Sequence, residues 1–269
     1  MTQADISGHM SYELDRNPSL EPSLREMAEA AINSLHAATK DAKKGYFLMI
    51  EASRIDHAGH SNDPVGHLHD TLMYNEVVDY VRSWINRHPE TQMLSAADHE
   101  CGGLTLVQEG YNPLILKNAN ATVEALATRF SRYTGSDAAG FLRSDIYPAY
   151  GISNPTSAEV AQLVPLKGSS NFGNALGRQI SARAGINWAT AQHSAVDISL
   201  FGYASPSENN KALRAEMGGN WDNTQLPGYI EKALGIRVKD ATAALRKDGT
   251  GWVGKRDLAM EKRSEHHHM

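Results

Sequence analysis

The sequence of 269 residues contains little of several features that mark particular classes of protein. Its one cysteine, Cys101, excludes a framework of internal disulfides. It has no excess of basic residues, because 26 Lys and Arg stand against 31 Asp and Glu, and the formal net charge of −5 argues against nucleic-acid binding. No apolar run approaches the roughly 20 residues of a membrane span. The first ten residues have neither the basic nor the apolar region of a signal peptide, so we expect none in this chain.

Apolar residues recur along the chain with two different periods, which predicts an α/β protein. Residues 21–38 and 63–88 carry apolar side chains at helical spacing, and Pro89 stops the second helix. The apolar run 46–50 follows Gly45 and predicts a buried strand. Strand, helix and strand in succession form the βαβ unit of a parallel sheet. The predicted helices cover 21–38, 63–88 and 223–235, and the predicted strands cover 46–50, 91–97 and 195–204.

Residues 105–190 interrupt this pattern. Gly, Pro, Asn and Ser are frequent there and the periodic segments are short, which indicates a loop-rich excursion or a cap-like insertion. Its tripeptide Asn120-Ala121-Thr122 is a glycosylation sequon, which is used only in the secretory pathway, and a chance surface tripeptide explains it equally well. The domains we expect are an α/β core at 1–104 and 191–235, the excursion at 105–190, and a polar tail at 236–269 whose histidines, 266–268, we exclude as tail or tag.

Potential metal ligands follow the first predicted strand. Glu51 comes directly after the apolar run, and Asp56 and His60 lie in the segment that leads into the next helix. Four positions separate Asp56 from His60, so one helical turn would aim both side chains the same way. Taken alone, an Asp-x-x-x-His pair arises by chance in a chain with 12 histidines, and Glu51 could simply pair with Arg54.

A second cluster follows the next predicted strand, which ends at Asp98 and His99. Adjacent residues of a regular strand point to opposite faces, so both can bind one ion only if the strand has ended; alone, the pair could equally cap a helix or lie in a turn. His193 precedes the third predicted strand and reaches the same edge only if the preceding loop returns across it. Ligand sites of parallel sheets form beyond the carboxyl ends of the strands, and mixed carboxylate and imidazole ligands suit Zn²⁺ with a neighbouring Mg²⁺.

The coincidence of these clusters at strand ends favours a metal site over chance. Three segments, FLMIEASRIDHAGHSNDP, SAADHECGGLTL and HSAVDISLFGYA, together with the closing NTQLPGYIEKALG, resemble the alkaline phosphatases, most closely their fungal, vacuolar-type members. The resemblance implies an α/β/α sandwich with a mainly parallel central sheet. It implies a phosphomonoesterase that uses two Zn²⁺ and one Mg²⁺ and forms a phosphoserine intermediate. It also implies phosphate monoester substrates, a homodimer, and a vacuolar or secretory location for the intact protein.

The resemblance further implies seven site residues, all within these motifs. Six of them would hold metal ions, and one would approach the phosphate through water. They are Glu51 for magnesium, Asp56, His60 and His193 for one zinc, Asp98 and His99 for the other zinc, and His57 beside the phosphate.

The chain departs from the family pattern mainly by what it lacks. No Asp-Ser-Ala tripeptide supplies a nucleophilic serine, and the family's bridging Asp, magnesium-site Thr and phosphate-clamping Arg have no counterparts. We therefore expect the C-terminal half of an alkaline phosphatase, with a sheet incomplete at its N-terminal side and no activity alone. Two alternatives stay open: a truncated, non-catalytic metal-binding remnant, and a relative such as a phosphomutase, sulfatase or phosphodiesterase. Cys101 stands where a small hydroxyl residue is common; a metal could draw its thiol, although a buried inert thiol is favoured.

Overall fold

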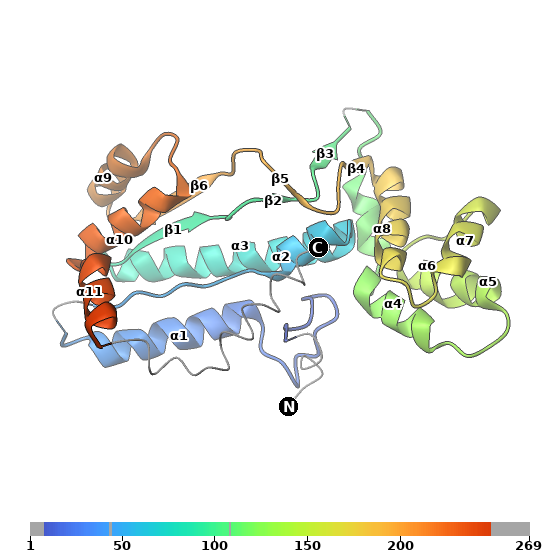
Figure 1. Cartoon of the computed structure of the whole chain (residues 1–269), viewed down its shortest axis with the longest axis horizontal. Helices are drawn as coiled ribbons and strands as arrows, with labels where there is room; N and C mark the ends of the chain where they lie inside the picture. The colour runs from blue at the N-terminus through green and yellow to red at the C-terminus, as the bar shows by residue number, and fades with distance from the viewer. Residues whose placement is uncertain (1–7, 43–44, 108, 249–269) are drawn as a thin grey trace. The chain divides into compact units, whose positions relative to one another are not determined.

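The computed structural model describes residues 8–42, 45–107 and 109–248, and Figure 1 shows the course of the chain. The chain divides into two compact units. The first comprises Met1–Ser34 and Leu48–Gly218, and the second comprises Leu35–Phe47 and Gly219–Met269. The candidate site and all the strands of the described residues lie in the first unit. The domain boundaries expected from the sequence stay a prediction.

Helices predicted at 21–38 and 63–88 are confirmed. The second begins where expected because the Asp63 side chain accepts a hydrogen bond from the Val65 backbone N–H at 2.9 Å. Pro64 occupies the first turn, where its missing N–H costs nothing. The first three helices of the chain are α1 (Leu24–Thr39), α2 (Arg54–His60) and α3 (Pro64–Arg87).

Six short strands form three antiparallel pairs among the described residues. The mainly parallel central sheet expected from the sequence is therefore not confirmed. One strand lies within the predicted segment 91–97, and another fills the second half of 195–204. The pairs are β1 (Gln92–Ala96) with β6 (Leu200–Ala204), β2 (Glu100–Cys101) with β5 (His193–Ser194), and β3 (Leu104–Leu106) with β4 (Ile186–Trp188).

The prediction of a buried strand at 46–50 is wrong. The segment has no regular secondary structure, and the side chains of Phe47 and Met49 are 56% and 77% exposed. A strand needs a hydrogen-bonded neighbour, and no described strand pairs with this segment. The apolar run therefore does not by itself predict a strand. Whether such a segment pairs and becomes buried depends on which other segments lie beside it in the fold.

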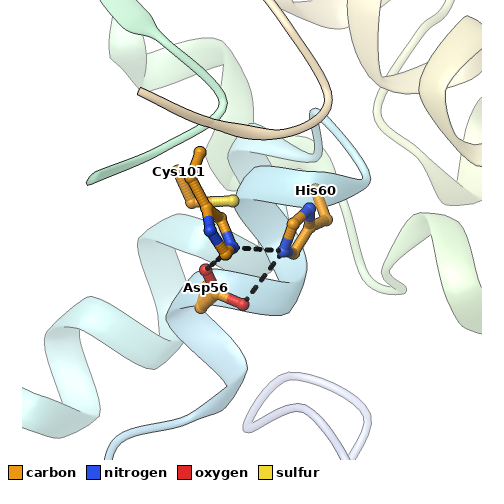
Figure 2. A group of neighbouring side chains, drawn as sticks. Asp56, His60 and Cys101 are labelled. Carbon is orange, nitrogen blue, oxygen red and sulfur yellow. Dashed lines mark hydrogen bonds and ion pairs between the residues drawn. The ribbon is translucent and has the colours of Figure 1, made fainter. Parts of the chain in front are cut away.

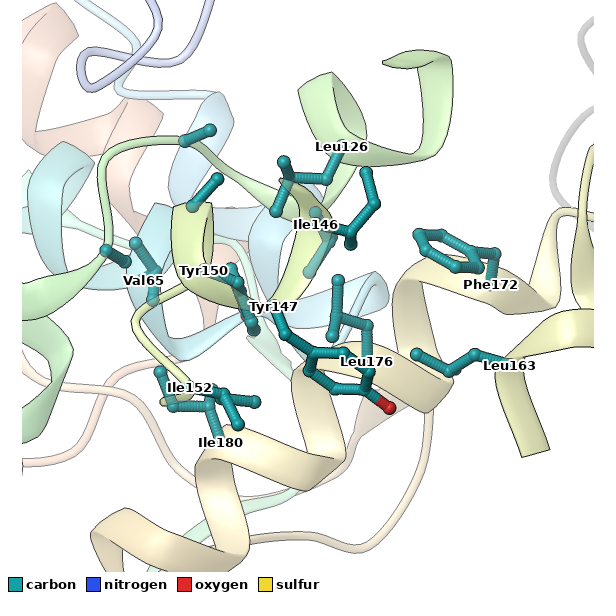
Figure 3. Packing of buried hydrophobic residues seen from close by; sticks show 14 of the residues in the cluster. Val65, Leu126, Ile146, Tyr147, Tyr150, Ile152, Leu163, Phe172, Leu176 and Ile180 are labelled. Carbon is teal, nitrogen blue, oxygen red and sulfur yellow. The ribbon is translucent and has the colours of Figure 1, made fainter. Parts of the chain in front are cut away.

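The excursion predicted as loop-rich is mostly helical and holds the main hydrophobic core. Figure 3 shows Leu126, Tyr147, Phe172 and Leu176 of this core packed together, each at most 1% exposed. The periodic segments recognised in the sequence correspond to α4 and α7. The elements are η2 (Pro113–Asn118), α4 (Val123–Arg132), α5 (Ala138–Phe141), the π-helical η3 (Leu142–Ile146), α6 (Tyr147–Ala149), α7 (Ser157–Leu163), η4 (Val164–Leu166) and α8 (Asn171–Ala184). We call α4 to α8 the helical region.

Asp63, which is fully buried, ties the start of α3 to the helical region. It accepts hydrogen bonds from the backbone N–H of Val123 at 3.0 Å and from the hydroxyl of Tyr150 at 2.7 Å. Burial raises the pKa of Asp63, against the lowering effect of these hydrogen bonds. Gly177 of α8 packs against the backbone of Asn62, the residue before Asp63. A Cβ added at Gly177 would lie 2.3 Å from the Asn62 carbonyl oxygen, so only glycine fits there. The connection between α2 and α3 is therefore firmly anchored.

The sequon residues have structural roles of their own. Asn120 is exposed, and its backbone N–H donates to the Ala149 carbonyl at 2.9 Å. The buried hydroxyl of Thr122 caps the N-terminus of α4 and donates to Asp15 at 2.5 Å. A threonine at this position is thus explained by helix capping, with or without glycosylation.

Helix α9 (Ser207–Met217), the last element of the first unit, follows β6 and lies against it. In the second unit, η5 (Asn223–Gln225) leads into α10 (Leu226–Leu234), which confirms the closing helix predicted at 223–235. Gly235 ends α10 with a φ of 62°, a left-handed conformation that glycine adopts at little cost.

The predicted polar tail contains α11 (Val238–Asp248), and the tail histidines lie outside the described residues. None of the described helices combines the length and the apolar character needed to cross a bilayer.

Candidate metal centre

Helix α2 delivers two of the predicted ligands on one face. Asp56 and His60 lie one turn apart, and the Asp56 Oδ2 atom is 3.3 Å from the His60 Nε2 atom. The side chains are 36% and 33% exposed, so solvent reaches both. The helical conformation expected for this pair from its spacing is the one observed.

The pairing of β2 with β5 brings a third predicted ligand to the same place. His193 in β5 stands opposite Cys101 in β2, and its Nε2 atom lies 3.2 Å from the Nε2 atom of His60. The ligand atoms of Asp56, His60, Cys101 and His193 all lie within 4.8 Å of one another. Figure 2 shows Asp56, His60 and Cys101 of this group converging from α2 and from the neighbouring β2.

The loop before β5 holds His60 in one orientation. The His60 Nδ1 atom is 2.7 Å from the carbonyl oxygen of Ala191. A carbonyl only accepts, so Nδ1 carries a hydrogen, and the Nε2 atom faces His193 and Asp56, where a metal ion would bind its lone pair in the neutral ring. Asn62 donates to the carbonyl of Thr190 at 2.8 Å and Asn174 to that of His60 at 2.7 Å, which fixes this loop and the end of α2.

A buried carboxylate oxygen of Asp56 that has no hydrogen-bond partner within the described part of the chain indicates that the group can hold a cation. The Oδ1 atom of Asp56 is buried and has no hydrogen-bond partner among the described residues. The nearest imidazole nitrogens, from His99 and His193, lie 3.9 and 4.0 Å away, too far for a hydrogen bond. A tetrahedral zinc with bonds of about 2.0–2.1 Å separates its ligand atoms by about 3.3 Å. The 3.2 and 3.3 Å spacings around His60 fit such an ion.

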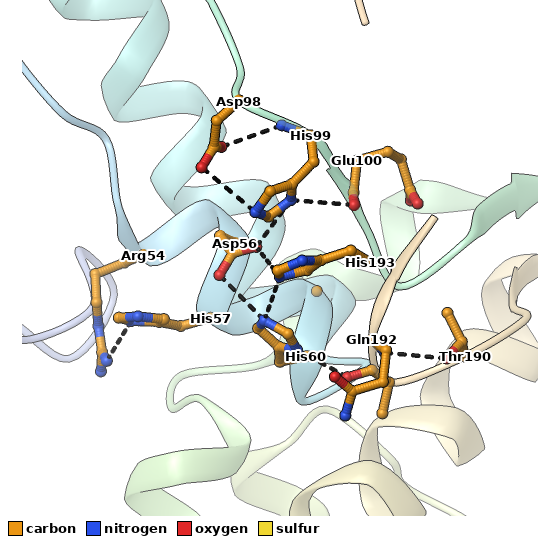
Figure 4. Close-up of polar contacts among 12 residues, drawn as sticks. Arg54, Asp56, His57, His60, Asp98, His99, Glu100, Thr190, Gln192 and His193 are labelled. Atoms are coloured by element: carbon orange, nitrogen blue, oxygen red, sulfur yellow. Dashed lines mark hydrogen bonds and ion pairs between the residues drawn. The ribbon is translucent and has the colours of Figure 1, made fainter. Parts of the chain in front are cut away.

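Asp98 and His99 lie beside this group. β1 has ended at Ala96, so the two side chains need not point to opposite faces, and the His99 Nε2 atom is 3.4 Å from the Asp98 Oδ2 atom. The imidazole of His99 stacks on that of His193 with ring centroids 3.4 Å apart (Figure 4). Asp98 is 79% exposed. The structure therefore brings His99 next to Asp56 and His193, and Asp98 contacts His99 on the exposed side.

Glu51 remains apart. It ends the extended segment just before α2, is exposed, and makes no hydrogen bond or ion pair with the part of the chain that the structure describes. The alternative pairing of Glu51 with Arg54 is wrong, because Arg54 donates to Glu124 at 2.7 Å.

His57 faces away from the ligand group toward Arg54 (Figure 4). The Nη1 atom of Arg54 lies 3.1 Å from the His57 Nδ1 atom. Arginine only donates, so Nδ1 accepts and the hydrogen of the neutral ring sits on Nε2. Burial, helped by the charge of Arg54, lowers the pKa of His57, which favours that neutral ring. The guanidinium also lies 3.7 Å from the centre of the Tyr12 ring.

Two residues of this region were not predicted as functional. Glu100 accepts hydrogen bonds from the backbone N–H groups of Gly103 and Leu104 at 3.1 and 3.0 Å and from the hydroxyl of Ser194, and so joins β2 to β5. Burial opposes its ionisation, yet these hydrogen bonds lower the pKa of Glu100. Burial, with the neighbouring Asp56, raises the pKa of the Cys101 thiol. In the sequence, the only indication of a role for Glu100 is that it follows the predicted ligand His99.

The sequence profile of the alkaline phosphatase family matches residues 6–236, so the chain belongs to that family. It is 31% identical to the alkaline phosphatase of Schizosaccharomyces pombe over 248 residues, which are 88% of this chain and 45% of that protein. It is also 31% identical to the repressible alkaline phosphatase of Saccharomyces cerevisiae, covering 87% of this chain and 45% of that protein. The chain thus spans about half the length of these relatives.

Solved structures agree on the fold. The crystal structure of Thermus thermophilus alkaline phosphatase matches 85% of this chain and 51% of its own, with a TM-score of 0.70 and 26% identity. The cold-active alkaline phosphatase from a psychrophilic Shewanella matches 84% of this chain and 53% of its own, with a TM-score of 0.68 and 24% identity. These matches support an α/β fold of the alkaline phosphatase type.

Proposed function

We propose that this chain provides three ligands of one zinc ion to a metal-dependent alkaline phosphatase, which hydrolyses phosphate monoesters through a phosphoserine intermediate. The ligands are Asp56, His60 and His193. The observation that carries the proposal is the convergence of two imidazole Nε2 atoms on a carboxylate whose buried oxygen has no hydrogen-bond partner. When bound, such ions lower the pKa of an attacking hydroxyl or water and neutralise charge on the phosphoryl group.

The remaining ligands serve the other two ions in this proposal. Asp98 and His99 contribute to the second zinc, and Glu51 contributes to magnesium. Zinc takes about four ligands and magnesium about six, so both ions need groups from outside this chain. Zinc titration of the purified chain, with the tail histidines replaced by alanine, is therefore expected to show one tight site. Two equally tight zinc sites would contradict this assignment.

His57 has a positioning role in this proposal. Its pKa is lowered and Arg54 holds its Nδ1 atom, so the neutral ring keeps Nε2–H as a donor, and because the ring faces away from the ligand group it reaches the phosphate only through water. The Arg54–Glu124 ion pair fixes the guanidinium that orients the ring. Replacing Arg54 with Gln should leave zinc affinity unchanged while broadening the NMR signal of the His57 ring, and an unchanged signal would remove this role.

Turnover is the decisive test. The chain alone has no nucleophilic serine in an Asp-Ser-Ala context, so we expect no zinc-dependent hydrolysis of p-nitrophenyl phosphate at alkaline pH. Co-expression with the N-terminal half of the S. pombe relative is expected to improve solubility and to restore hydrolysis, which Asp56→Ala abolishes. A stable complex that binds zinc and does not turn over would favour the non-catalytic remnant. Robust turnover by the chain alone would mean a different nucleophile.

The homodimer and the vacuolar or secretory location belong to the proposal as well. They rest on family membership alone. Light scattering of the restored enzyme tests the first, and the location of the tagged intact protein in cells tests the second. A monomer that retains full activity, or an intact protein confined to the cytosol, would overturn the respective statement.

A further inference from the structure

Cys101 lies inside the group of zinc ligands proposed above. Its Sγ atom is within 4.8 Å of the ligand atoms of Asp56, His60 and His193. The thiol is half-buried and forms no disulfide, since the chain has no second cysteine. The sequence favours a buried inert thiol at this position, but the structure places the thiol beside a carboxylate and two imidazoles.

Two features of the fold bring the thiol there. Cys101 stands directly opposite His193 in the antiparallel β2–β5 pair, and residues opposite each other in such a pair project from the same face. Helix α2 approaches β2 at Gly59, where an added Cβ would lie 3.0 Å from the Cβ and 3.1 Å from the Sγ of Cys101. The glycine therefore allows the thiol to come within reach of the helix that carries Asp56 and His60.

The unsatisfied oxygen of Asp56 supports a metal ion at this point. It is buried with no hydrogen-bond partner, and the nitrogens and sulfur of the group surround the same carboxylate. One oxygen, two nitrogens and one sulfur make four ligand atoms, the number that a tetrahedral zinc requires. Thiolate sulfur favours zinc and softer ions over magnesium.

We propose that Cys101 is the fourth protein ligand of the ion held by Asp56, His60 and His193. This inference rests on the proposed zinc site and adds a ligand to it. On binding, the S–H bond breaks, the proton leaves to solvent, and the sulfur lone pair forms a bond to the ion. Three protein ligands leave a zinc position open for water or substrate, and the thiolate closes that position. The site is then selective for thiophilic ions, and the thiolate must leave the ion before a substrate oxygen can bind there.

The presence of a single cysteine makes the test direct, because any thiolate-to-metal band in this chain reports on Cys101. Cd²⁺ is titrated into the purified chain carrying alanine at the three tail histidines. We expect an ultraviolet charge-transfer band that saturates at one equivalent and is absent in Cys101→Ser. Cys101→Ser should bind Zn²⁺ at least about 10-fold more weakly. Losing a residue that only orients a metal ligand already weakens affinity about 10- to 100-fold, and a direct ligand should contribute no less. Far-ultraviolet circular dichroism verifies that the variant is folded.

A second measurement uses the unaltered thiol and does not depend on the folding of a variant. Zn²⁺ is expected to protect Cys101 from a chromogenic disulfide reagent with one-to-one stoichiometry, and His193→Ala should abolish the protection. If the chain binds one Zn²⁺ with no cadmium band, no protection and unchanged affinity in Cys101→Ser, Cys101 is not a ligand and the zinc site stands without it. If the chain binds neither metal, the zinc site itself is refuted and this inference with it.

Discussion

The helical region and the candidate metal centre lie in the same compact unit but are built in opposite ways. Phe130, Tyr147 and Leu176 of the helical region are fully buried in one hydrophobic cluster. The side chains of Asp56, His60 and His193 in the metal centre are polar and 36%, 33% and 47% exposed. Close packing specifies the first arrangement, whereas a few loop contacts and short strand pairs specify the second.

This difference indicates where stability and function reside. Each buried apolar side chain contributes through the area it removes from water, so the helical region supports the fold without any ligand. The imidazoles of His99 and His193, stacked at 3.4 Å, and the unpartnered Asp56 oxygen gain little from one another and much from a cation. Mutations in the two regions should therefore change different measurements.

The largest effect is expected from Phe130→Ala. Removing a fully buried phenylalanine leaves a cavity and costs about 3–5 kcal/mol in the free energy of unfolding, measured by urea denaturation. The control is Phe201→Ala on β6, where the side chain is 59% exposed and the expected change is within about 0.5 kcal/mol. Equal losses in both variants would contradict the contrast between the regions.

His60→Ala tests the other side of the comparison. Loss of a direct ligand should weaken Zn²⁺ binding at least about 100-fold, because losing a residue that only orients a metal ligand already weakens binding by up to about 100-fold. The free energy of unfolding without metal should fall by only about 0.5–1.5 kcal/mol, because one hydrogen bond, from His60 to the Ala191 carbonyl, is lost. His69→Ala, in α3 outside the ligand group, is the matched control. A similar loss of affinity in both variants would show that zinc binds elsewhere.

Tyr150→Phe probes the link between the regions. The variant removes the hydroxyl that donates to the fully buried Asp63 at 2.7 Å. A hydrogen bond to a charged group contributes about 1.5–3 kcal/mol, and we expect a loss of that size in the free energy of unfolding. Tyr203→Phe, whose hydroxyl donates to Asn86 on the surface, should cost less. If Tyr150→Phe is harmless, Asp63 is satisfied without it and does not anchor the α2–α3 connection as described.

The smallest effect concerns pH. Burial lowers the pKa of His67, whose ring lies 6.0 Å from that of Trp188, although Glu100 raises it. Below its ordinary pKa of about 6.5, the unfolded chain binds the proton more readily than the folded chain, so stability falls as pH falls through that value. His67→Asn should flatten the dependence of the free energy of unfolding on pH between about 7 and 5, while His69→Asn should not. An unchanged slope in His67→Asn would show that His67 titrates alike in both states.

Local chemistry made parts of this protein predictable. The N-cap Asp63 followed by Pro64 set the start of α3, and the spacing of Asp56 and His60 put both on one face of α2. The helices of the segment 105–190 were not predicted, because most of them are short and the loops between them contain many Gly, Pro, Asn and Ser, which weakens the periodic signal. Helix formation depends on contacts within a few residues, so local patterns predict it where the helix is long enough.

The sequence by itself determined the family, the helices at 21–38, 63–88 and 223–235, and the motifs that carry the predicted ligands. The tertiary structure alone decided that β1 pairs antiparallel with β6, that 46–50 forms no strand, and that Cys101 faces His193. Strand pairing joins residues about a hundred positions apart, and no local pattern encodes which distant backbone supplies the hydrogen bonds. For the same reason, the approach of Gly59 to Cys101, and with it the fourth ligand we propose, was visible only in the folded chain.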